Sequence, residues 1–180
     1  MKLRAYRPQD AAGILSIYGP VVATSSATFE YEVPSLEAFE KRLAAIAGRF
    51  PFLVAEADDG SLAGYAYGTT HRERIAYQWA VETSVYVREP GQGLGRKLYD
   101  ALLPQLADRG FLWAYGVITQ PNPASIALHA ACGYESFATY SAAGQKFGQW
   151  HDVHWMRKAL HSPTPQQPAP HFAPAQDPQP

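Results

Sequence analysis

The most regular pattern of apolar and polar positions in the chain runs from Val81 to Leu106. It opens with β-branched residues at alternate positions, separated by polar or aromatic ones, and this period of two is typical of a strand with two unlike faces. Glycines then alternate with other residues, and leucines recur every fourth position, which is the spacing of one helix face. The residues are Val81, Thr83, Val85 and Val87, then Gly91, Gly93 and Gly95, then Leu94, Leu98, Leu102 and Leu106. The stretch therefore predicts a strand, a glycine-rich turn and a helix.

The same patterns predict further elements on either side of this unit. A helix after Asp10 should end near Gly19-Pro20, and Ser35 can cap a second helix. Asn122-Pro123 combines a cap with a proline in the first helical position, and Gly133 should end that helix in the left-handed conformation. Strands are expected at residues 2–6, 52–57, 62–67, 81–87, 113–118, 134–141 and 150–158.

These elements all lie within residues 1–160, which we expect to form one α/β domain, long enough to bury a sizeable core. From His161 onward the sequence is rich in proline and has no hydrophobic period. Segments of that composition rarely bury enough apolar surface to fold. Residues 161–180 are therefore predicted to be a disordered tail with no part in the core.

Composition and charge argue against several classes of function. The formal net charge is −1, and no basic run offers a track for a phosphate backbone, so nucleic acid is not an expected partner. No segment approaches the length that spans a membrane, and the N-terminus has no apolar signal segment. The single cysteine, Cys132, excludes an intrachain disulfide and fits a reducing compartment. We therefore expect a cytoplasmic protein with no membrane partner.

The glycine-rich turn is the first candidate for chemistry. Backbone N–H groups of such a turn can converge on an anion, and the helix N-terminus adds its partial positive charge. The turn alone is equally consistent with a tight connection that binds nothing. It is not a nucleoside-triphosphate loop, because Arg96-Lys97-Leu98 follows Gly95, and it lacks the G-x-G-x-x-G spacing of dinucleotide-binding folds.

Polar side chains elsewhere could carry proton transfer. Asn122, Ser125 and His129 share one face of an otherwise apolar helix; a lone helical histidine is most often structural, yet imidazole also titrates near neutrality. Glu82 is either a solvated glutamate or, beside a bound cofactor, a general base for an attacking amine. His151 and His154 invite a metal interpretation, but residues three apart in a strand face opposite ways, so we expect no metal site.

Five segments, in order along the chain, resemble the GCN5-related N-acetyltransferase (GNAT) superfamily and, within it, the phosphinothricin N-acetyltransferase family. They are R-F-P-F-L-V-A-E (49–56), A-Y-Q-W-A-V-E-T-S-V-Y-V (76–87), G-L-G (93–95), Q-P-N-P-A-S-I-A-L-H-A-A-C-G-Y (120–134) and A-A-G-Q-K-F-G-Q-W-H-D-V (142–153). The last two are specific to the family rather than to the superfamily. The match spans nearly everything before about residue 160.

The resemblance implies an α/β GNAT acyl-CoA N-acyltransferase fold. Its central sheet would be mixed and mostly antiparallel, flanked by helices, with two parallel strands that splay to admit the pantetheine arm of acetyl-CoA. The implied reaction is acetylation of the α-amino group of a small amino acid or analogue, such as phosphinothricin, methionine sulfoximine or methionine sulfone. Family members often form homodimers with their sites near the interface, and a homodimer is expected here.

The resemblance also implies roles for individual residues. Glu82 takes the position of a catalytic glutamate. His129 stands where many acetyltransferases of the superfamily have a tyrosine, implicated as the acid that protonates the departing thiolate, and the chain resembles its own family in having histidine there instead. His129 can be that acid, share proton removal with Glu82, or be structural. The implied cofactor-binding residues are Val85, Tyr86, Val87, Gly91, Gln92, Gly93, Leu94, Gly95, Arg96, Asn122 and Ser125. The implied substrate-binding residues are Phe29, Arg72, Arg74 and Tyr77. Core packing explains Phe29 at least as readily, and Arg72 and Arg74 are explained equally well as solvated residues of a basic loop.

Two departures from the family pattern affect these expectations. Pro90 stands where the phosphate turn should begin with Gln or Arg, and proline removes one backbone donor, so coenzyme A should bind more weakly or in a different arrangement. Glu30 replaces an expected basic residue beside Phe29, which bears on the acceptor. The alternatives are a GNAT enzyme acting on another small amine or a peptide N-terminus, a non-catalytic acyl-CoA-binding protein, and a phosphate-binding scaffold. Trp79, Phe29 and Trp150 suggest a closed aromatic pocket, which favours a small acceptor over a peptide.

Overall fold

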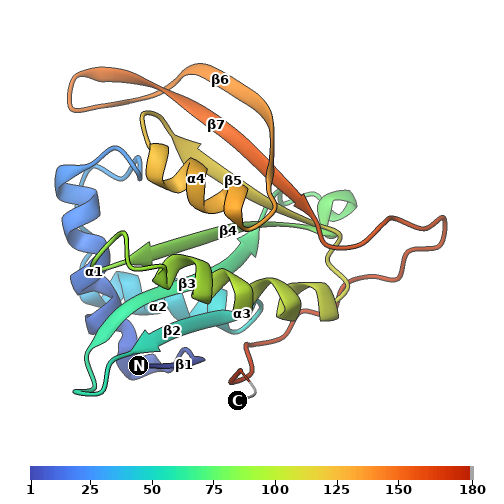
Figure 1. Ribbon diagram of the computed structural model, residues 1–180, viewed down its shortest axis with the longest axis horizontal. Coiled ribbons are helices and arrows are strands. Elements are labelled where there is room, and N and C mark those ends of the chain that lie inside the picture. Colours follow the sequence, from blue (N-terminus) through green and yellow to red (C-terminus); the bar gives the residue numbers. More distant parts are fainter. Residues whose placement is uncertain (179–180) are drawn as a thin grey trace.

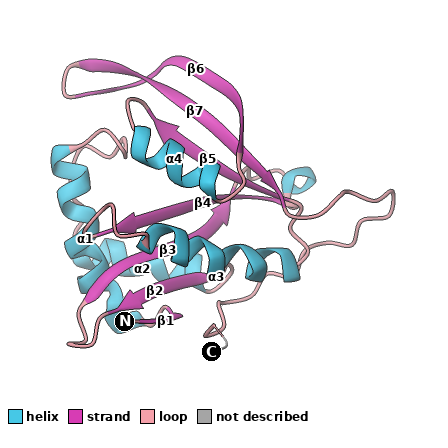
Figure 2. Cartoon of the chain, viewed as in Figure 1, coloured by secondary structure: helices cyan, strands magenta, loops and turns pink. Residues whose placement is uncertain are grey.

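A computed structural model describes residues 1–178 as one seven-stranded sheet with helices on both faces (Figures 1 and 2). The strand order is β1-β2-β3-β4-β5-β7-β6, and every pair is antiparallel except β4 and β5. The elements are β1 (Lys2–Ala5), η1 (Pro8–Asp10), α1 (Ala11–Thr24), α2 (Leu36–Ala47), β2 (Phe52–Glu56), β3 (Leu62–Thr70), η2 (Ile75–Tyr77), β4 (Ala80–Val87), α3 (Leu94–Asp108), β5 (Trp113–Thr119), α4 (Pro123–Ala131), β6 (Glu135–Lys146) and β7 (Gln149–Ala159). The mixed sheet confirms the predicted α/β class.

The two faces of the sheet carry separate hydrophobic cores. On one face α3 buries the predicted leucine stripe, in which Leu98, Leu102 and Leu106 are fully buried, against β2, β3 and β4. On the other face α1 and α2 pack on β2 and β3 around residues such as Ile14 and Phe39. Because alternate residues of β4 serve the two faces, Val81 joins the α3 core while Glu82 faces the other way.

The two parallel strands, β4 and β5, are hydrogen-bonded to each other over only part of their length. Ala80–Glu82 of β4 pairs with Trp113–Tyr115 of β5, and the register ends there. Beyond Glu82, β4 stays paired with β3 as far as Val87, but its opposite edge has no strand partner within the described residues. A strand edge of this kind presents unpaired N–H and C=O groups. The predicted splay between two parallel strands is therefore confirmed.

The sequence signals predicted the starts of two helices correctly and the end of a third incorrectly. The Ser35 and Asn122 side chains accept hydrogen bonds from the N–H groups of Ala38 and Ser125, as expected of N-caps. Helix α1 is different: it continues through Pro20 to Thr24 instead of ending near Gly19-Pro20. Val22, beyond the proline, is fully buried, and its packing favours continuation of the helix despite the cost of an internal proline. Asp10 does not cap α1 with its side chain.

Asp10 instead belongs to a buried ion pair. Its carboxylate oxygens accept hydrogen bonds from Arg4 Nη1 and Nη2, both at 2.8 Å, and from the Arg7 N–H at 2.7 Å. The partly exposed Glu56 contacts Arg4 Nε at 2.5 Å. The first strand is thereby fixed to the start of α1.

The last two strands form a hairpin longer than predicted. β6 extends to Lys146 and β7 begins at Gln149, so the turn consists of Phe147 and Gly148, both with positive φ. Irregular register near residues 140–144 bends β6, and Figure 1 shows the hairpin arching over α4 and the end of α1. Its tip is thus placed beside the segment that follows α1.

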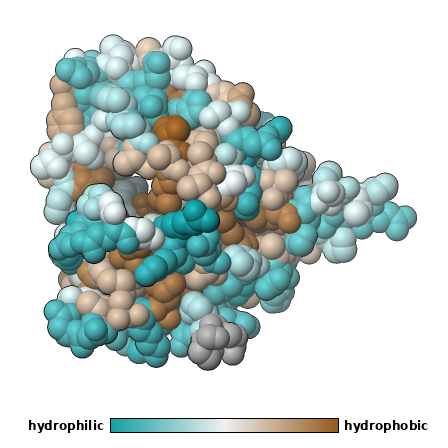
Figure 3. All heavy atoms as spheres, in the orientation of Figure 1, coloured by the Kyte–Doolittle hydropathy of each residue, from teal (hydrophilic) through white to brown (hydrophobic). Residues whose placement is uncertain are grey.

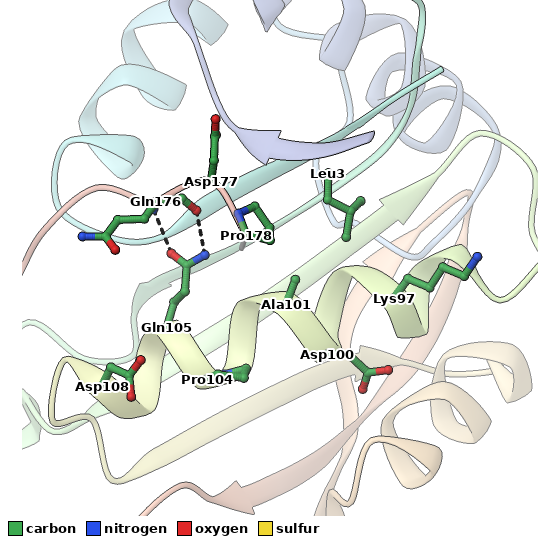
Figure 4. A pocket seen from close by; sticks show the side chains of 10 residues that line it. All are labelled: Leu3, Lys97, Asp100, Ala101, Pro104, Gln105, Asp108, Gln176, Asp177 and Pro178. Atoms are coloured by element: carbon green, nitrogen blue, oxygen red, sulfur yellow. Dashed lines mark hydrogen bonds between the residues drawn. The ribbon is translucent and has the colours of Figure 1, made fainter. Parts of the chain in front are cut away.

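The C-terminal segment differs from the predicted disordered tail. Residues 161–167 project away from the domain, and the chain then returns along α3 toward β1 (Figure 1). Phe172 packs against Phe50 and Phe111, each at 5.5 Å between ring centroids. Gln105 of α3 exchanges two hydrogen bonds with the Gln176 main chain (Figure 4). The expectation of no part in the core fails at Phe172, because one aromatic ring in a polar segment meets an apolar patch; residues 179–180 lie outside those described.

Candidate active site

A groove opens where β4 leaves β5, between the glycine-rich turn and α4. Its volume is about 460 Å³, and Figure 3 shows the surface hollowed at this place. We call it the β4 groove. Its lining is Val21, Ser25, Ala27, Val85, Tyr86, Val87, Glu89, Pro90, Gly91, Gly93, Leu94, Gly95, Arg96, Asn122, Ala124, Ser125 and Leu128.

The β4 groove gathers ten of the eleven predicted cofactor-binding residues. The exception is Gln92, whose side chain bonds to Glu89 and lines a separate cavity on the other side of the turn. Arg88, which follows β4, does not line the groove either, and its side chain donates to Leu62 O and Ser16 Oγ. Three segments that are far apart in sequence, around Ser25, Gly93 and Asn122, meet here.

The turn has the geometry of an anion-binding loop. Gly91 and Gly93 have φ of +90° and +73°, and neither has a heavy atom within 4 Å of where a Cβ would lie. Gly93 precedes the first turn of α3, whose N–H groups have no partner within the helix. Arg96 reaches the groove from that turn and is only loosely paired with Asp100, at 3.7 Å. Backbone donors, a helix N-terminus and one cation therefore converge.

The inner end of the groove continues into a recess formed around α4. This recess is lined by Thr83, Ser84, Tyr99, Val117 and His129, among others, and shares Asn122 and Ser125 with the groove. The polar stripe predicted on α4 is therefore real, and it faces the cavity. Asn122 both caps the helix and lines the groove, so its capping role is compatible with the predicted contact to the cofactor.

His129 is buried and fully engaged. Its Nδ1 lies 2.8 Å from Ser125 O, an acceptor only, so Nδ1 carries the hydrogen; Nε2 then accepts from the Tyr99 hydroxyl at 3.1 Å. Burial lowers its pKa, so the neutral ring is favoured. A neutral imidazole with both nitrogens hydrogen-bonded lines the recess and ties α4 to Tyr99 of α3.

Glu82 lies at the last paired position of β4 and β5, opposite Tyr115. Its Oε1 is 3.0 Å from His71 Nδ1, and its side chain is 28% exposed. Burial raises the pKa of Glu82, while the hydrogen bond from His71 and the charge of Arg72 oppose that rise. In its ionised form, a carboxyl at this place can accept a proton from an amine or a water that reaches the splay.

The predicted substrate residues do not form one cavity. Arg72, Arg74 and Tyr77 line a small cavity of about 100 Å³ together with Phe172. Phe29 lies elsewhere, under the β6–β7 hairpin, where its ring packs so closely on Gly144 that a Cβ there would come within 2.3 Å. Glu30 forms an ion pair with Arg42 of α2.

The closed pocket suggested for Trp79, Phe29 and Trp150 is not formed. Trp150 is 66% exposed, and the Trp79 indole donates to Pro168 O in the tail. Rings collect around His71 instead: Tyr115 stacks on it at 4.5 Å, and Tyr77 and Trp155 present their edges. These rings belong to residues other than the three named for the pocket.

Sequence reasoning missed His71, Lys146 and Gly116. His71 was not singled out in the sequence, where it stands close to Arg72 and Arg74. It comes near Glu82 because Thr69, two residues before it, pairs with Glu82 in the β3–β4 register. Lys146 is 2% exposed, and no pattern marks a buried lysine. Gly116 lies against His129, where a Cβ would approach to 2.5 Å.

Gly116→Ala should therefore destabilise the protein by about 1–3 kcal/mol, the usual cost of overpacking. The His129 ring cannot retreat, because Tyr99 and Tyr134 flank it at 5.3 and 4.9 Å between centroids. Denaturant unfolding measures the change, and Gly19→Ala, with only ordinary contact to Val33, is the control. Combining Gly116→Ala with His129→Ala should relieve the clash; a single variant as stable as the wild type would contradict this packing.

The residues present fit acetyl-CoA. The turn offers donors for a pyrophosphate, and the free edge of β4 offers main-chain groups for an amide-containing arm laid along it. No group of three His, Cys, Asp or Glu side chains arranged to hold a metal occurs among residues 1–178, and His151 and His154 bond to different partners, Gln120 O and the Thr139 and Ser136 hydroxyls. Across the same residues no helix has the length and apolar character to cross a membrane.

Comparison with known proteins agrees with this geometry. The family described as "Acetyltransferase (GNAT) domain" matches residues 3–155. The phosphinothricin N-acetyltransferase of Streptomyces viridochromogenes is 36% identical over 170 residues, 93% of this chain and 92% of its own. The L-methionine sulfoximine/L-methionine sulfone acetyltransferase of Pseudomonas paraeruginosa is 35% identical over 84% of this chain and 90% of its own.

A solved structure shares the whole architecture. The GNAT superfamily phosphinothricin acetyltransferase of Sinorhizobium meliloti, crystallised with acetyl-CoA, superimposes with a TM-score of 0.86 at 34% identity, covering 92% of this chain and 94% of that one. The splayed sheet and its groove define an acyl-CoA-dependent acyltransferase fold. With the family match, the chain belongs to the GNAT acetyltransferase family.

Proposed function

We propose that this protein transfers the acetyl group of acetyl-CoA to the α-amino group of a small amino acid or analogue of the phosphinothricin, methionine sulfoximine or methionine sulfone type. One observation carries the proposal: the β4 groove runs from the glycine turn along the unpaired edge of β4 toward the splay, and Glu82 lies at the splay. The named activities of the relatives support the acceptor class.

Within this proposal each residue has a distinct task. Acetyl-CoA supplies the acetyl group as a thioester. Glu82 removes one proton from the acceptor ammonium, so that the amine can attack; the C–N bond forms, the C–S bond breaks, and the second amine proton neutralises the departing thiolate. Glu82 then returns its proton to solvent. Main-chain groups of Val85, Tyr86 and Val87 align the arm, and His129 shapes the recess beside it.

The acceptor class is tested by release of coenzyme A thiol. Acetyl-CoA is mixed with phosphinothricin, methionine sulfoximine, methionine sulfone, an amine without a carboxylate and a peptide. We expect turnover of the amino acids and little of the last two. Turnover of the simple amine or peptide alone would keep the enzyme and discard the acceptor class, whereas acetyl-CoA binding without any turnover would favour a binding protein.

Arg96→Gln should weaken acetyl-CoA binding by about fivefold, near 1 kcal/mol, because a cation leaves the phosphate end of the groove. Lys97→Gln removes the same charge one residue away. Lys97 lines two other cavities and not the β4 groove, so it serves as the matched control. Calorimetric titration gives both dissociation constants; equal effects would mean that Arg96 acts only through long-range charge.

We propose in addition that the protein is cytoplasmic and forms a homodimer. Apolar side chains exposed on β5 and β6 support the homodimer, with Val117 at 39%, Phe137 at 45% and Tyr140 at 50%. Patches of this kind commonly mark protein interfaces. Light scattering coupled to size exclusion measures the mass, and a monomer at all concentrations would overturn the proposal.

A further inference from the structure

His71 is hydrogen-bonded to Glu82, but the proposed reaction gives it no task. We propose that His71 is a positioning residue for Glu82: its Nδ1–H donates to Oε1, fixes the carboxylate at the splay of the sheet and leaves Oε2 as the proton acceptor. The inference deepens the proposed acetyl transfer and rests on it. The two atoms are 3.0 Å apart.

The hydrogen bond has a fixed direction. An ionised carboxylate only accepts, so His71 Nδ1 must carry the hydrogen whether the ring is neutral or charged. Glu82 Oε2 has no hydrogen bond among residues 1–178 and is not a buried unpaired atom. One oxygen is therefore anchored while the other remains open to an acceptor amine or a bridging water.

The His71 ring is itself immobilised. Tyr115 of β5 stacks on it with ring planes 13° apart, and Tyr77 of η2 and Trp155 of β7 meet it edge-on at 6.1 and 5.9 Å. Its side chain is 11% exposed. A ring packed from three directions holds its Nδ1–H in one place, so little entropy is lost when it orients a carboxylate.

The surrounding charges allow the effect on Glu82 to be predicted. The groups that face the pair are Arg72 from the loop after β3, Tyr67 from β3, Tyr77 from η2 and Tyr115 from β5. Burial raises the pKa of Glu82, and the His71 hydrogen bond, which favours the ionised form, opposes that rise. Removing His71 should therefore raise this pKa further and leave less carboxylate at a given pH.

The test compares His71→Ala, His71→Asn and His171→Ala. Asparagine places an amide N–H near the position of Nδ1 and does not titrate, and His171 is an exposed tail residue whose side chain has no hydrogen bond to the described residues. For His71→Ala we expect kcat to fall about tenfold, part of the 10²–10⁴-fold that a positioned base contributes. The acid limb of kcat/KM should move to higher pH, KM for acetyl-CoA should stay unchanged, and His71→Asn should recover most of both losses.

Carbon NMR of the Glu82 carboxyl gives a second readout that needs no turnover. The Glu82 pKa should rise in His71→Ala and return in His71→Asn. If the wild type acetylates nothing, the proposed function fails while this titration still tests the pair. The inference would be overturned if a folded His71→Ala variant kept both the wild-type Glu82 pKa and the wild-type kcat. It would also be overturned if His71→Asn were as impaired as His71→Ala, since the proton of His71 itself, and not its hydrogen bond to Glu82, would then be needed.

Discussion

Glu82→Gln should lower kcat for acetyl transfer by about 10²-fold or more, with KM for acetyl-CoA nearly unchanged. Glutamine keeps the size of the side chain and can still contact His71, but it cannot take a proton, and a positioned general base contributes about 10²–10⁴-fold. Glu82 lies outside the set of residues that line the β4 groove, so acetyl-CoA affinity should not depend on it. The measurement is steady-state release of coenzyme A thiol.

The pH profile separates loss of the base from a general defect. Because burial raises the Glu82 pKa, wild-type kcat/KM should fall with decreasing pH at values above the ordinary range of glutamate, where the carboxyl becomes protonated. That limb should disappear in Glu82→Gln. Glu135→Gln, an exposed glutamate at the start of β6, is the matched control. Near wild-type turnover in Glu82→Gln would move proton removal to solvent or to another group.

Much of the catalytic framework could be predicted because it is local. The alternation in β4, the glycine turn and the leucine stripe of α3 all lie within 26 consecutive residues, from 81 to 106, and each signal reports the conformation of its own segment. The Asn122 cap and the polar stripe of α4 are similarly local. These local pieces come together in one site because the parallel strands β4 and β5 separate after Glu82, which places the glycine turn and α4 on the same groove.

What could not be predicted depends on register and on distant contacts. His71 meets Glu82 only through the β3–β4 pairing, and Gly116 is constrained only by a ring from α4. Pro20 indicated a helix end because the cost of proline in a helix can be read from the sequence. The burial of Val22, which favours continuation of α1, depends on tertiary packing and cannot be read from it. The packing of Phe172 on Phe50 and Phe111 was not predicted, because the proline-rich composition around it indicated disorder. A single aromatic ring is enough to hold this segment against an apolar patch.

Lys146 is the strongest of these distant contacts. From the end of β6 its Nζ donates to three main-chain carbonyls, Val22 O and Ser25 O at 2.7 Å and Thr28 O at 2.9 Å. Those carbonyls lie at the end of α1 and in the segment after it, where Ser25 and Ala27 form one wall of the β4 groove. The lysine thereby couples the hairpin tip to the groove, over more than 110 residues of sequence.

Lys146→Met should consequently cost about 3 kcal/mol or more of stability and weaken acetyl-CoA binding several-fold. Methionine fills the volume but leaves three carbonyls without a donor, and each hydrogen bond to a buried charge contributes about 1.5–3 kcal/mol. Denaturant unfolding measures the first effect and calorimetric titration the second. Lys41→Met is the control, because its exposed pair with Glu37 is 75% and 78% accessible and such pairs contribute little. If Lys146→Met were stable but bound acetyl-CoA weakly, the lysine would act on the groove alone; if stability fell while affinity stayed, the wall at Ser25 and Ala27 would not depend on this anchor.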